Sequence, residues 1–181
     1  MVLYGPEQAW SLCDHVVRND VHLARWSPPH PEGYLTEAYW EARGKRNLDD
    51  AEAGRAFRFA IRWRDEPHGP VLGLLSLTDV ARGAQQWANL GYGLDEREQG
   101  KGIMTEAVRA ACAWAFTEQR LHRISASYMP GNERSGRVLR RAGFSVYGYA
   151  RDYLFINGAW RDHLLAALVD PRELDPEGRG V

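Results

Sequence analysis

The feature that most constrains this chain is a short glycine-bearing link between a strand pattern and a helix pattern. Residues 85–94 are typical of a strand, and apolar residues recur at helical spacing over residues 103–118. Gly100 and Gly102 flank Lys101 between them. Glycine has no Cβ, so its backbone amides can approach a ligand closely, and the first amides of a helix are unpaired and partly positive. The link indicates either an anion site suited to phosphate or a plain glycine-rich turn.

Two common nucleotide-binding loops do not fit this link. A Walker loop needs Gly-Lys-Ser/Thr, but here Lys101 lies between the glycines and no such triplet follows. A dinucleotide fingerprint needs a third glycine, which is absent.

The remaining patterns predict an α+β fold with a mixed sheet. Residues 144–156 and 159–169 flank Asn157-Gly158, a strong hairpin signal. A helix is expected over residues 132–143, capped by Asn132 and ended by Gly143. Further strands are expected at residues 1–4, 56–64, 71–80, 85–94 and 123–128, and further helices from Pro6, over 34–46 and over 103–118. We predict one domain, residues 1–170, and a loose polar tail, residues 171–181.

Composition excludes several functional classes. The chain has 181 residues, with 23 Lys and Arg against 24 Asp and Glu, so no direct nucleic-acid binding is expected. No apolar run reaches the roughly 20 residues of a membrane span, and the N-terminus does not resemble a signal peptide. Cys13 and Cys112 lack metal or redox spacing and the histidines are scattered, so we expect a cytoplasmic protein without a metal.

Three stretches resemble the GNAT N-acetyltransferases over nearly the whole chain. Residues 97–102, Arg-Glu-Gln-Gly-Lys-Gly, fit the R/Q-x-x-G-x-G/A signature of that family. Residues 122–144 resemble the family's strand and Asn-x-x-Ser helix. Residues 148–168 resemble the closing hairpin of the Rim-type branch, which acetylates ribosomal protein N-termini, and are most similar to its alanine-specific members. The N-terminus departs from the pattern, because the first strand is several residues short.

The resemblance implies the GNAT fold and acetyl-CoA as co-substrate. That fold is a mostly antiparallel sheet of six to seven strands with flanking helices, splayed at a central bulge that Gly91 and Gly93 would suit. The amides of the link would hold the pyrophosphate, and the backbone near Tyr92 and Leu94 would contact pantetheine. The cofactor-binding residues implied are Tyr92, Leu94, Arg97, Glu98, Gln99, Gly100, Lys101, Gly102, Ile103, Asn132 and Arg137.

The resemblance also implies direct acetyl transfer to a primary amine, which needs a base and an acid. Ser135 is the expected proton donor to the leaving thiolate, with Asn132 beside it and Tyr147 or Tyr128 as rival hydroxyls. Asn132 is also readable as a plain helix cap. Related enzymes often have a glutamate at the position before Gly148, but this chain has Tyr147 there. The base is therefore left open among Asp152, Glu98 and Asp162.

Other residues carry alternative interpretations. Arg134, Arg137 and Arg141 follow helical spacing and suit either the nucleotide's 3′-phosphate or a solvated face. Cys112 is interpreted as core, because no base partner is evident.

The expected acceptor is a protein N-terminus, most simply that of a ribosomal protein, by resemblance. Two interpretations are open for the aromatic residues Trp26 and Tyr34, and for Pro28 and Trp40 near them. They would either form the groove that binds the acceptor or pack in the protein interior. A small-molecule amine acceptor, and a non-catalytic acyl-CoA-binding or ribosome-docking module, stay open. The chain is expected to be a monomer or homodimer.

Overall fold

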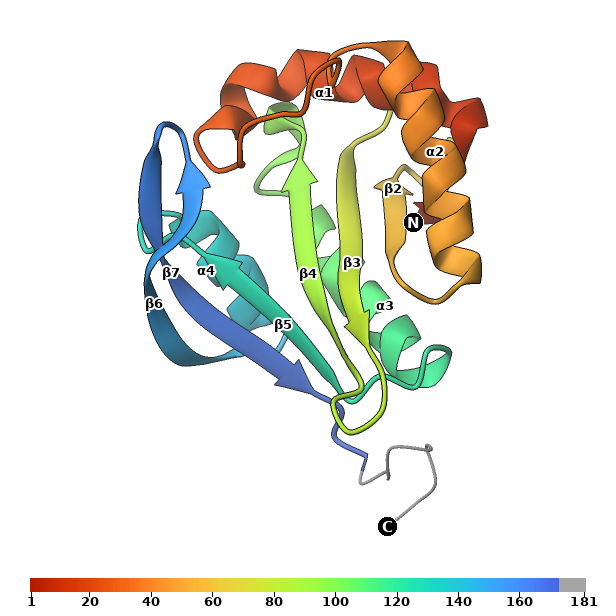
Figure 1. The fold of residues 1–181 in the computed structure, drawn as a ribbon. Helices are drawn as coiled ribbons and strands as arrows, with labels where there is room; N and C mark the ends of the chain where they lie inside the picture. The colour runs from red at the N-terminus through yellow and green to blue at the C-terminus, as the bar shows by residue number, and fades with distance from the viewer. Residues whose placement is uncertain (173–181) are drawn as a thin grey trace.

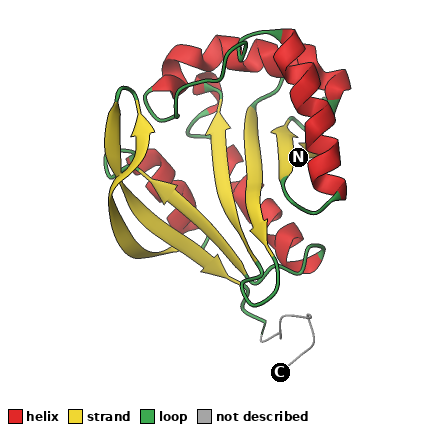
Figure 2. Cartoon of the chain, viewed as in Figure 1, coloured by secondary structure: helices red, strands yellow, loops and turns green. Residues whose placement is uncertain are grey.

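A computed structural model describes residues 1–172 as a seven-stranded mixed sheet flanked by helices (Figure 1, Figure 2). The strand order is β1-β2-β3-β4-β5-β7-β6, and every pair is antiparallel except β4 with β5. The strands are β1 (Val2–Leu3), β2 (Phe57–Ile61), β3 (Gly73–Ala81), β4 (Trp87–Leu94), β5 (Arg123–Tyr128), β6 (Ser145–Ile156) and β7 (Ala159–Val169). The helices are η1 (Pro6–Gln8), α1 (Ala9–Ala24), α2 (Glu37–Glu52), η2 (Glu96–Glu98), α3 (Ile103–Thr117) and α4 (Glu133–Arg141).

The helices divide between the two faces of the sheet, as Figure 2 shows. One core packs α3 against the sheet through residues such as Leu75, Leu77 and Val108, and α4 adds Leu139 to it. A second, smaller core lies under α1 and α2, and comprises Tyr4, Ala9, Leu12, Val16, Trp40, Ala60 and Val71. Alternation of side chains places neighbouring residues of β2 in different cores, with Phe59 and Ile61 in the first and Ala60 in the second.

The centre of the sheet is splayed, as expected. β4 and β5 pair only from Trp87 with Arg123 to Asn89 with Ser125. Beyond these rungs, residues 90–94 of β4 pair with β3 alone, and residues 126–128 of β5 pair with β7 alone. A V-shaped opening therefore separates two adjacent strands of one sheet (Figure 1).

The bulge lies on a different strand from the one expected. Gly91 and Gly93 pair regularly with β3, and the register shift falls between Thr78 and Ala81 of β3, where Asp79 has a φ of 53°. A Cβ on Gly91 would lie 3.2 Å from Ser76 Oγ of β3, a tight contact, whereas one on Gly93 would make ordinary contact with Leu23 of α1 at 3.5 Å. The glycines therefore allow close packing on β4 and do not distort it.

Several element boundaries differ from those predicted. The helix expected over 34–46 is α2, which begins after the N-cap Thr36 and runs to Glu52. The hairpin turn is confirmed, with φ of 48° at Asn157 and 76° at Gly158. Its outer strand β6 is irregular, because the register with β7 shifts between Val146 and Gly148 and again between residues 150 and 154.

The first residues of the expected tail are held in place. Arg172 donates a 2.8 Å hydrogen bond to the carbonyl of Phe116 and pairs with the buried Asp170. Residues 173–181 lie outside the described residues, so the boundary at residue 170 stays a prediction.

Candidate active site

The glycine link forms an open cradle of backbone amides. Gly100 and Gly102 have φ of 79° and 84°, in the left-handed region that favours glycine. Gly102 is the N-cap of α3 and makes no side-chain hydrogen bond. The first hydrogen bond of the helix runs from the Glu106 amide to the Gly102 carbonyl at 3.1 Å. The amides of residues 103–105 therefore have no helical acceptor. A Cβ on either glycine would meet nothing within 4 Å. Space, free donors and the positive helix end together fit a diphosphate.

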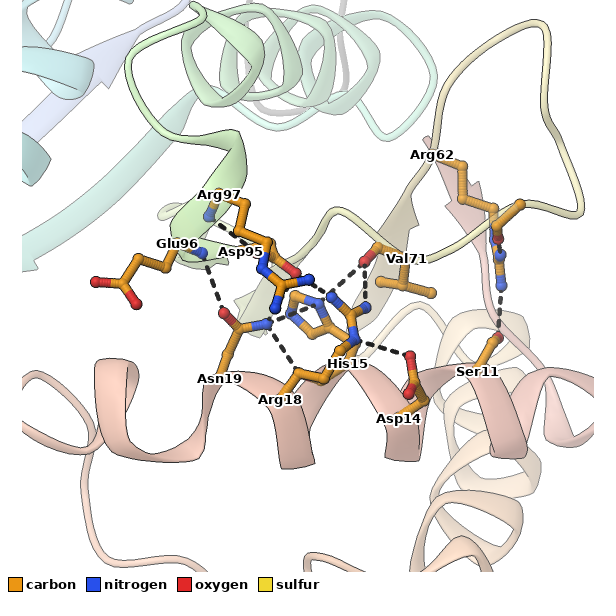
Figure 3. Close-up of polar contacts among 11 residues, drawn as sticks. Ser11, Asp14, His15, Arg18, Asn19, Arg62, Val71, Asp95, Glu96 and Arg97 are labelled. Atoms are coloured by element: carbon orange, nitrogen blue, oxygen red, sulfur yellow. Dashed lines mark hydrogen bonds and ion pairs between the residues drawn. The ribbon is translucent and has the colours of Figure 1, made fainter.

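Helix α1 holds the entry to this cradle through Asp95, as Figure 3 shows. The Asp95 carboxylate accepts hydrogen bonds from two amides. One is the Arg97 backbone amide in the same turn, at 3.0 Å, and the other is the Asn19 side-chain amide, at 3.2 Å. Arg18 adds an ion pair, and Asn19 Oδ1 accepts from the Glu96 amide at 3.0 Å. Two neighbouring residues of α1 thus fix both ends of a two-residue segment just before the cradle.

Burial and charge tune this polar cluster. Burial raises the pKa of Asp95, but hydrogen bonds from the Arg97 amide and Asn19, with the charge of Arg18, outweigh it and leave that pKa below its usual value. Burial and the charge of Arg18 lower the pKa of His15 to about 4. His15 Nδ1 therefore donates to the Val71 carbonyl at 3.1 Å as a neutral ring.

Gln99 joins the link to two helices. Its side-chain amide nitrogen lies 2.7 Å from His22 Nε2 of α1, and its carbonyl oxygen accepts from Arg134 of α4. Lys101 pairs with Glu98 at 3.0 Å within the link itself. The side chains of Glu98, Gln99 and Lys101 are thus engaged with the protein, which leaves the backbone of the link for a ligand.

Two hydroxyl groups meet across the V-shaped opening. Tyr92 Oη, from β4, lies 2.8 Å from Ser135 Oγ and 3.2 Å from the Ser135 carbonyl, on the first turn of α4. Asn132 caps that turn by accepting from the Ser135 amide at 3.2 Å. Burial raises the pKa of Tyr92 to about 12, so the phenol is neutral near pH 7 and can donate to Ser135 Oγ.

Tyr128 packs against the same turn of α4. A Cβ on Gly136 would lie 2.8 Å from Cε2 of Tyr128 and 3.2 Å from its hydroxyl oxygen. Only glycine lets the β5 tyrosine approach this closely, since real Cβ contacts are longer. Tyr92, Tyr128 and Ser135 therefore form one hydroxyl cluster from β4, β5 and α4.

Comparisons with known proteins identify this arrangement. A family model described as an acetyltransferase (GNAT) domain matches residues 6–145. The chain belongs to the GNAT acetyltransferase family. It is 40% identical to the [ribosomal protein uS5]-alanine N-acetyltransferase of Escherichia coli (strain K12) over 169 residues, which cover 93% of this chain and 86% of that one.

Solved structures agree with this GNAT assignment. The ribosomal-protein-S5-alanine acetyltransferase of Vibrio fischeri is similar with a TM-score of 0.89 and 36% identity, covering 93% of this chain and 91% of that one. Mycobacterium smegmatis RimJ in complex with CoA-disulfide is similar with a TM-score of 0.83 and 30% identity, covering 91% of this chain and 78% of that one. The chain is therefore an N-acetyltransferase with the GNAT fold.

Some residues expected at this GNAT site lie elsewhere. Tyr147 stacks over the Arg123 guanidinium at 4.7 Å on the face away from α3, and it makes no contact with Ser135 within residues 1–172. Arg137 is exposed and pairs with Glu133 at 3.2 Å, which favours the interpretation of a solvated face. Leu94, in contrast, stays a candidate for pantetheine, because it pairs with Gly73 of β3 and no strand within residues 1–172 covers its other edge.

Of the acceptor-slot candidates, only Tyr34 lines a shallow pocket, formed by the loop between α1 and α2. The pocket has a volume of about 340 Å³, and Tyr34 stacks there on His30 with ring centroids 4.0 Å apart. The Arg25 guanidinium lies over the Trp26 ring, with its Cζ atom 5.7 Å from the ring centroid. Trp40 is only 3% exposed and packs in the second core, so it has the packing role.

Two of the three base candidates, Glu98 and Asp162, have side-chain partners. Glu98 pairs with Lys101, and Asp162 accepts from the Tyr149 hydroxyl and, at 2.9 Å, from the Asp152 amide. Burial raises the pKa of the Cys112 thiol to about 12, as suits a core cysteine. In the described part of the chain, no three His, Cys, Asp or Glu side chains group as metal ligands, and no helix has the length and apolarity of a membrane span.

Sequence reasoning missed the supports of the cradle. Asn19 and His15 are polar residues four apart on α1, and both are almost fully buried. Their spacing hinted at a shared buried face, but nothing local linked them to residue 95, 76 positions later. The Tyr92 side chain was missed too, because only its backbone was considered.

Proposed function

We propose that this chain transfers the acetyl group of acetyl-CoA to the N-terminal α-amino group of a ribosomal protein. The meeting of Tyr92 and Ser135 across the V, beside an open amide cradle, carries the proposal. The ribosomal acceptor is supported by the relatives, two of which are alanine N-acetyltransferases of uS5 or S5 by name. Location in the cytoplasm stays a prediction.

The backbone provides the binding of acetyl-CoA in this proposal. The backbone amides of the link and the free amides of residues 103–105 bind the pyrophosphate, and Asn132 adds a polar side chain beside Ser135. The free edge of residues 90–94 suits the amides of pantetheine, since no strand covers it. One amide near Gly91 or Tyr92 polarises the thioester carbonyl, a contribution of roughly 3 kcal/mol.

The acceptor amine needs little activation. An α-amino group has a pKa near 7.7–8.0, so about a tenth is neutral at pH 7. A water relay to a carboxylate therefore suffices as base, and Asp152, Glu98 and Asp162 stay the candidates. The nitrogen lone pair attacks the thioester carbon, and the attacking nitrogen gives its proton to that relay.

The hydroxyl pair serves the leaving group. When the C–S bond breaks, the electron pair goes to sulfur, and Ser135 gives the thiolate its proton. Tyr92 then gives its proton to Ser135 Oγ, and water restores the phenol. The pKa of about 12 keeps the phenol protonated until this step.

The experiment measures acetyl transfer to peptides. Purified protein, acetyl-CoA and alanine-starting peptides should release CoA and add 42 Da, the mass of one acetyl group, to the α-amino group by mass spectrometry. Polyamines and amino sugars serve as the alternative acceptors. Transfer to these amines and none to peptides would refute the protein acceptor, and thermal stabilisation by CoA with no transfer to any amine would indicate an inert binding module.

A further inference from the structure

A second pocket lies on the face of the sheet away from α3. Its volume is about 400 Å³, and its walls are Gln85, Trp87, Arg123, Ser125 and Tyr147. Arg123 and Ser125 flank Ile124, which is fully buried in the core with α3, so strand alternation turns them to the other face. The pocket therefore lies where β4 and β5 still pair, just before they separate.

This face is the one open to an acceptor. The Tyr92–Ser135 pair and the α3 cradle lie on the α3 and α4 side, which leaves the opposite side of the V for the amine. In Figure 1, α1 and α2 do not cross in front of the lower ends of β4 and β5. A peptide that lies along this face from the V toward the paired ends of β4 and β5 reaches the pocket.

The pocket offers hydrogen-bond donors suited to an anion. Tyr147 holds the Arg123 guanidinium from one side by a cation–π contact at 4.7 Å, and no carboxylate within residues 1–172 pairs with Arg123. Ser125 is only 6% exposed, and its hydroxyl has no hydrogen-bond partner among the described residues. The acidic Asp79 nearby on the sheet is already bound by Asn89 at 2.9 Å.

Resting on the proposed function, we propose that this pocket binds a carboxylate side chain of the acceptor, three to five residues after the acetylated N-terminus. A guanidinium and a buried hydroxyl bind a carboxylate through charge-assisted hydrogen bonds. The ring of Trp87 provides an apolar wall beside these two donors. The acceptor is thus a protein N-terminus with Asp or Glu near its start.

The spacing follows from the register of the strands. Continuing the parallel rungs past Asn89 and Ser125 brings Tyr92 level with Tyr128. Five residues then separate the hydroxyl cluster from Arg123, about 16 Å at roughly 3.3 Å per residue. An extended peptide with its amine in the V therefore places its fourth to sixth side chain at the pocket.

The experiment scans one glutamate along an alanine-starting peptide. Eight-residue peptides carry Glu at one position from 2 to 8, and each has a Gln-containing partner. For the wild type we expect kcat/KM about fivefold to tenfold higher with Glu than with Gln at positions 4–6 only. Arg123→Gln should abolish this preference with the KM for acetyl-CoA unchanged, and Arg46→Gln, an exposed arginine of α2, should keep it.

Arg123→Glu provides an independent check, because it should favour Lys over Gln at the same positions. Thermal melting confirms that each variant is folded. Equal rates for Glu and Gln peptides, or a preference that survives in Arg123→Gln, overturn the pocket assignment and leave acetyl transfer to N-termini standing. Failure of every peptide as acceptor overturns both the pocket and the proposed function.

Discussion

At the scale of single residues, the described site depends on one short contact between side chains from different elements. Tyr92 and Ser135 are 43 positions apart in the chain, and their hydroxyl oxygens lie 2.8 Å apart. The resemblance predicted Ser135 and its neighbour Asn132. The partner Tyr92 could not be predicted from local sequence, because the direction of its side chain depends on how far β4 and β5 diverge.

We expect Ser135→Ala to lower kcat by about tenfold to a hundredfold, with acetyl-CoA affinity nearly unchanged. The loss is partial because a thiolate of pKa near 8.5 is a fair leaving group by itself. Steady-state kinetics and calorimetric binding of CoA test this. Tyr92→Phe, which keeps the ring and loses the hydroxyl, should give a smaller drop, and unchanged kcat in both variants would remove the pair from the mechanism.

Gly102 gives a second prediction at this scale. Gly102→Val should weaken acetyl-CoA binding by about tenfold or more, because a branched residue strains at a φ of 84° and turns the cradle amides away. The space around it is open, so the fold should persist. Circular dichroism checks the fold and fluorescence titration the affinity; normal affinity would place the diphosphate elsewhere.

At the scale of elements, α1 positions the cradle without facing a ligand itself. Arg18 is shared between two carboxylates, Asp14 on its own helix at 2.9 Å and Asp95 at the entry to the cradle. These two aspartates form a matched pair for testing, since both contact the same guanidinium and only one supports the link.

Asp95→Asn should raise the KM for acetyl-CoA several-fold with little change in kcat, and Asp14→Asn should change neither. The new amide would face the Asn19 amide nitrogen, now 3.2 Å from the carboxylate. The double variant Asn19→Asp/Asp95→Asn again places a donor opposite an acceptor, so its KM for acetyl-CoA should return most of the way to the wild-type value. A fall in melting temperature without a change in KM would mean that Asp95 has only a structural role.

The sequence predicted which helices and strands form better than it predicted the residues at which they begin, end or bulge. The helix α4, its Asn132 cap and the Asn157-Gly158 turn are confirmed, because capping and turn chemistry are local. The start of α2 and the bulge on β3 were missed, because the first depends on Thr36 as a cap and the second on a contact between Asp79 and Asn89 across strands. Long-range contacts, not propensity, decide such details.

At the scale of the whole molecule, buried titratable groups couple stability to pH. His15 is fully buried and its pKa falls from 6.5 to about 4, so the folded state binds fewer protons than the unfolded chain between these values. Stability should therefore decrease as pH falls from about 6.5 to 4, by roughly 3 kcal/mol from this residue. Asp95, whose pKa is also lowered, costs further stability as pH falls through its folded pKa.

His15→Phe should flatten the upper part of this acid dependence. Phenylalanine fills a similar volume and does not titrate, although it loses the hydrogen bond to Val71 and lowers stability at neutral pH. Chemical denaturation at half-unit steps from pH 7.5 to 4 measures the slope. An identical slope in both proteins would show that another group causes the acid sensitivity.

The outer strand β6 limits how copies of this molecule can associate. It ends the sheet and exposes Tyr147, Tyr149, Tyr153 and Phe155, a composition that would invite another chain to add a strand. Two register shifts and a φ of 47° at Asp152 interrupt its backbone, so no long straight row of donors and acceptors faces outward. Continuous fibre-like extension of the sheet through this rim is therefore disfavoured by the backbone of β6 itself.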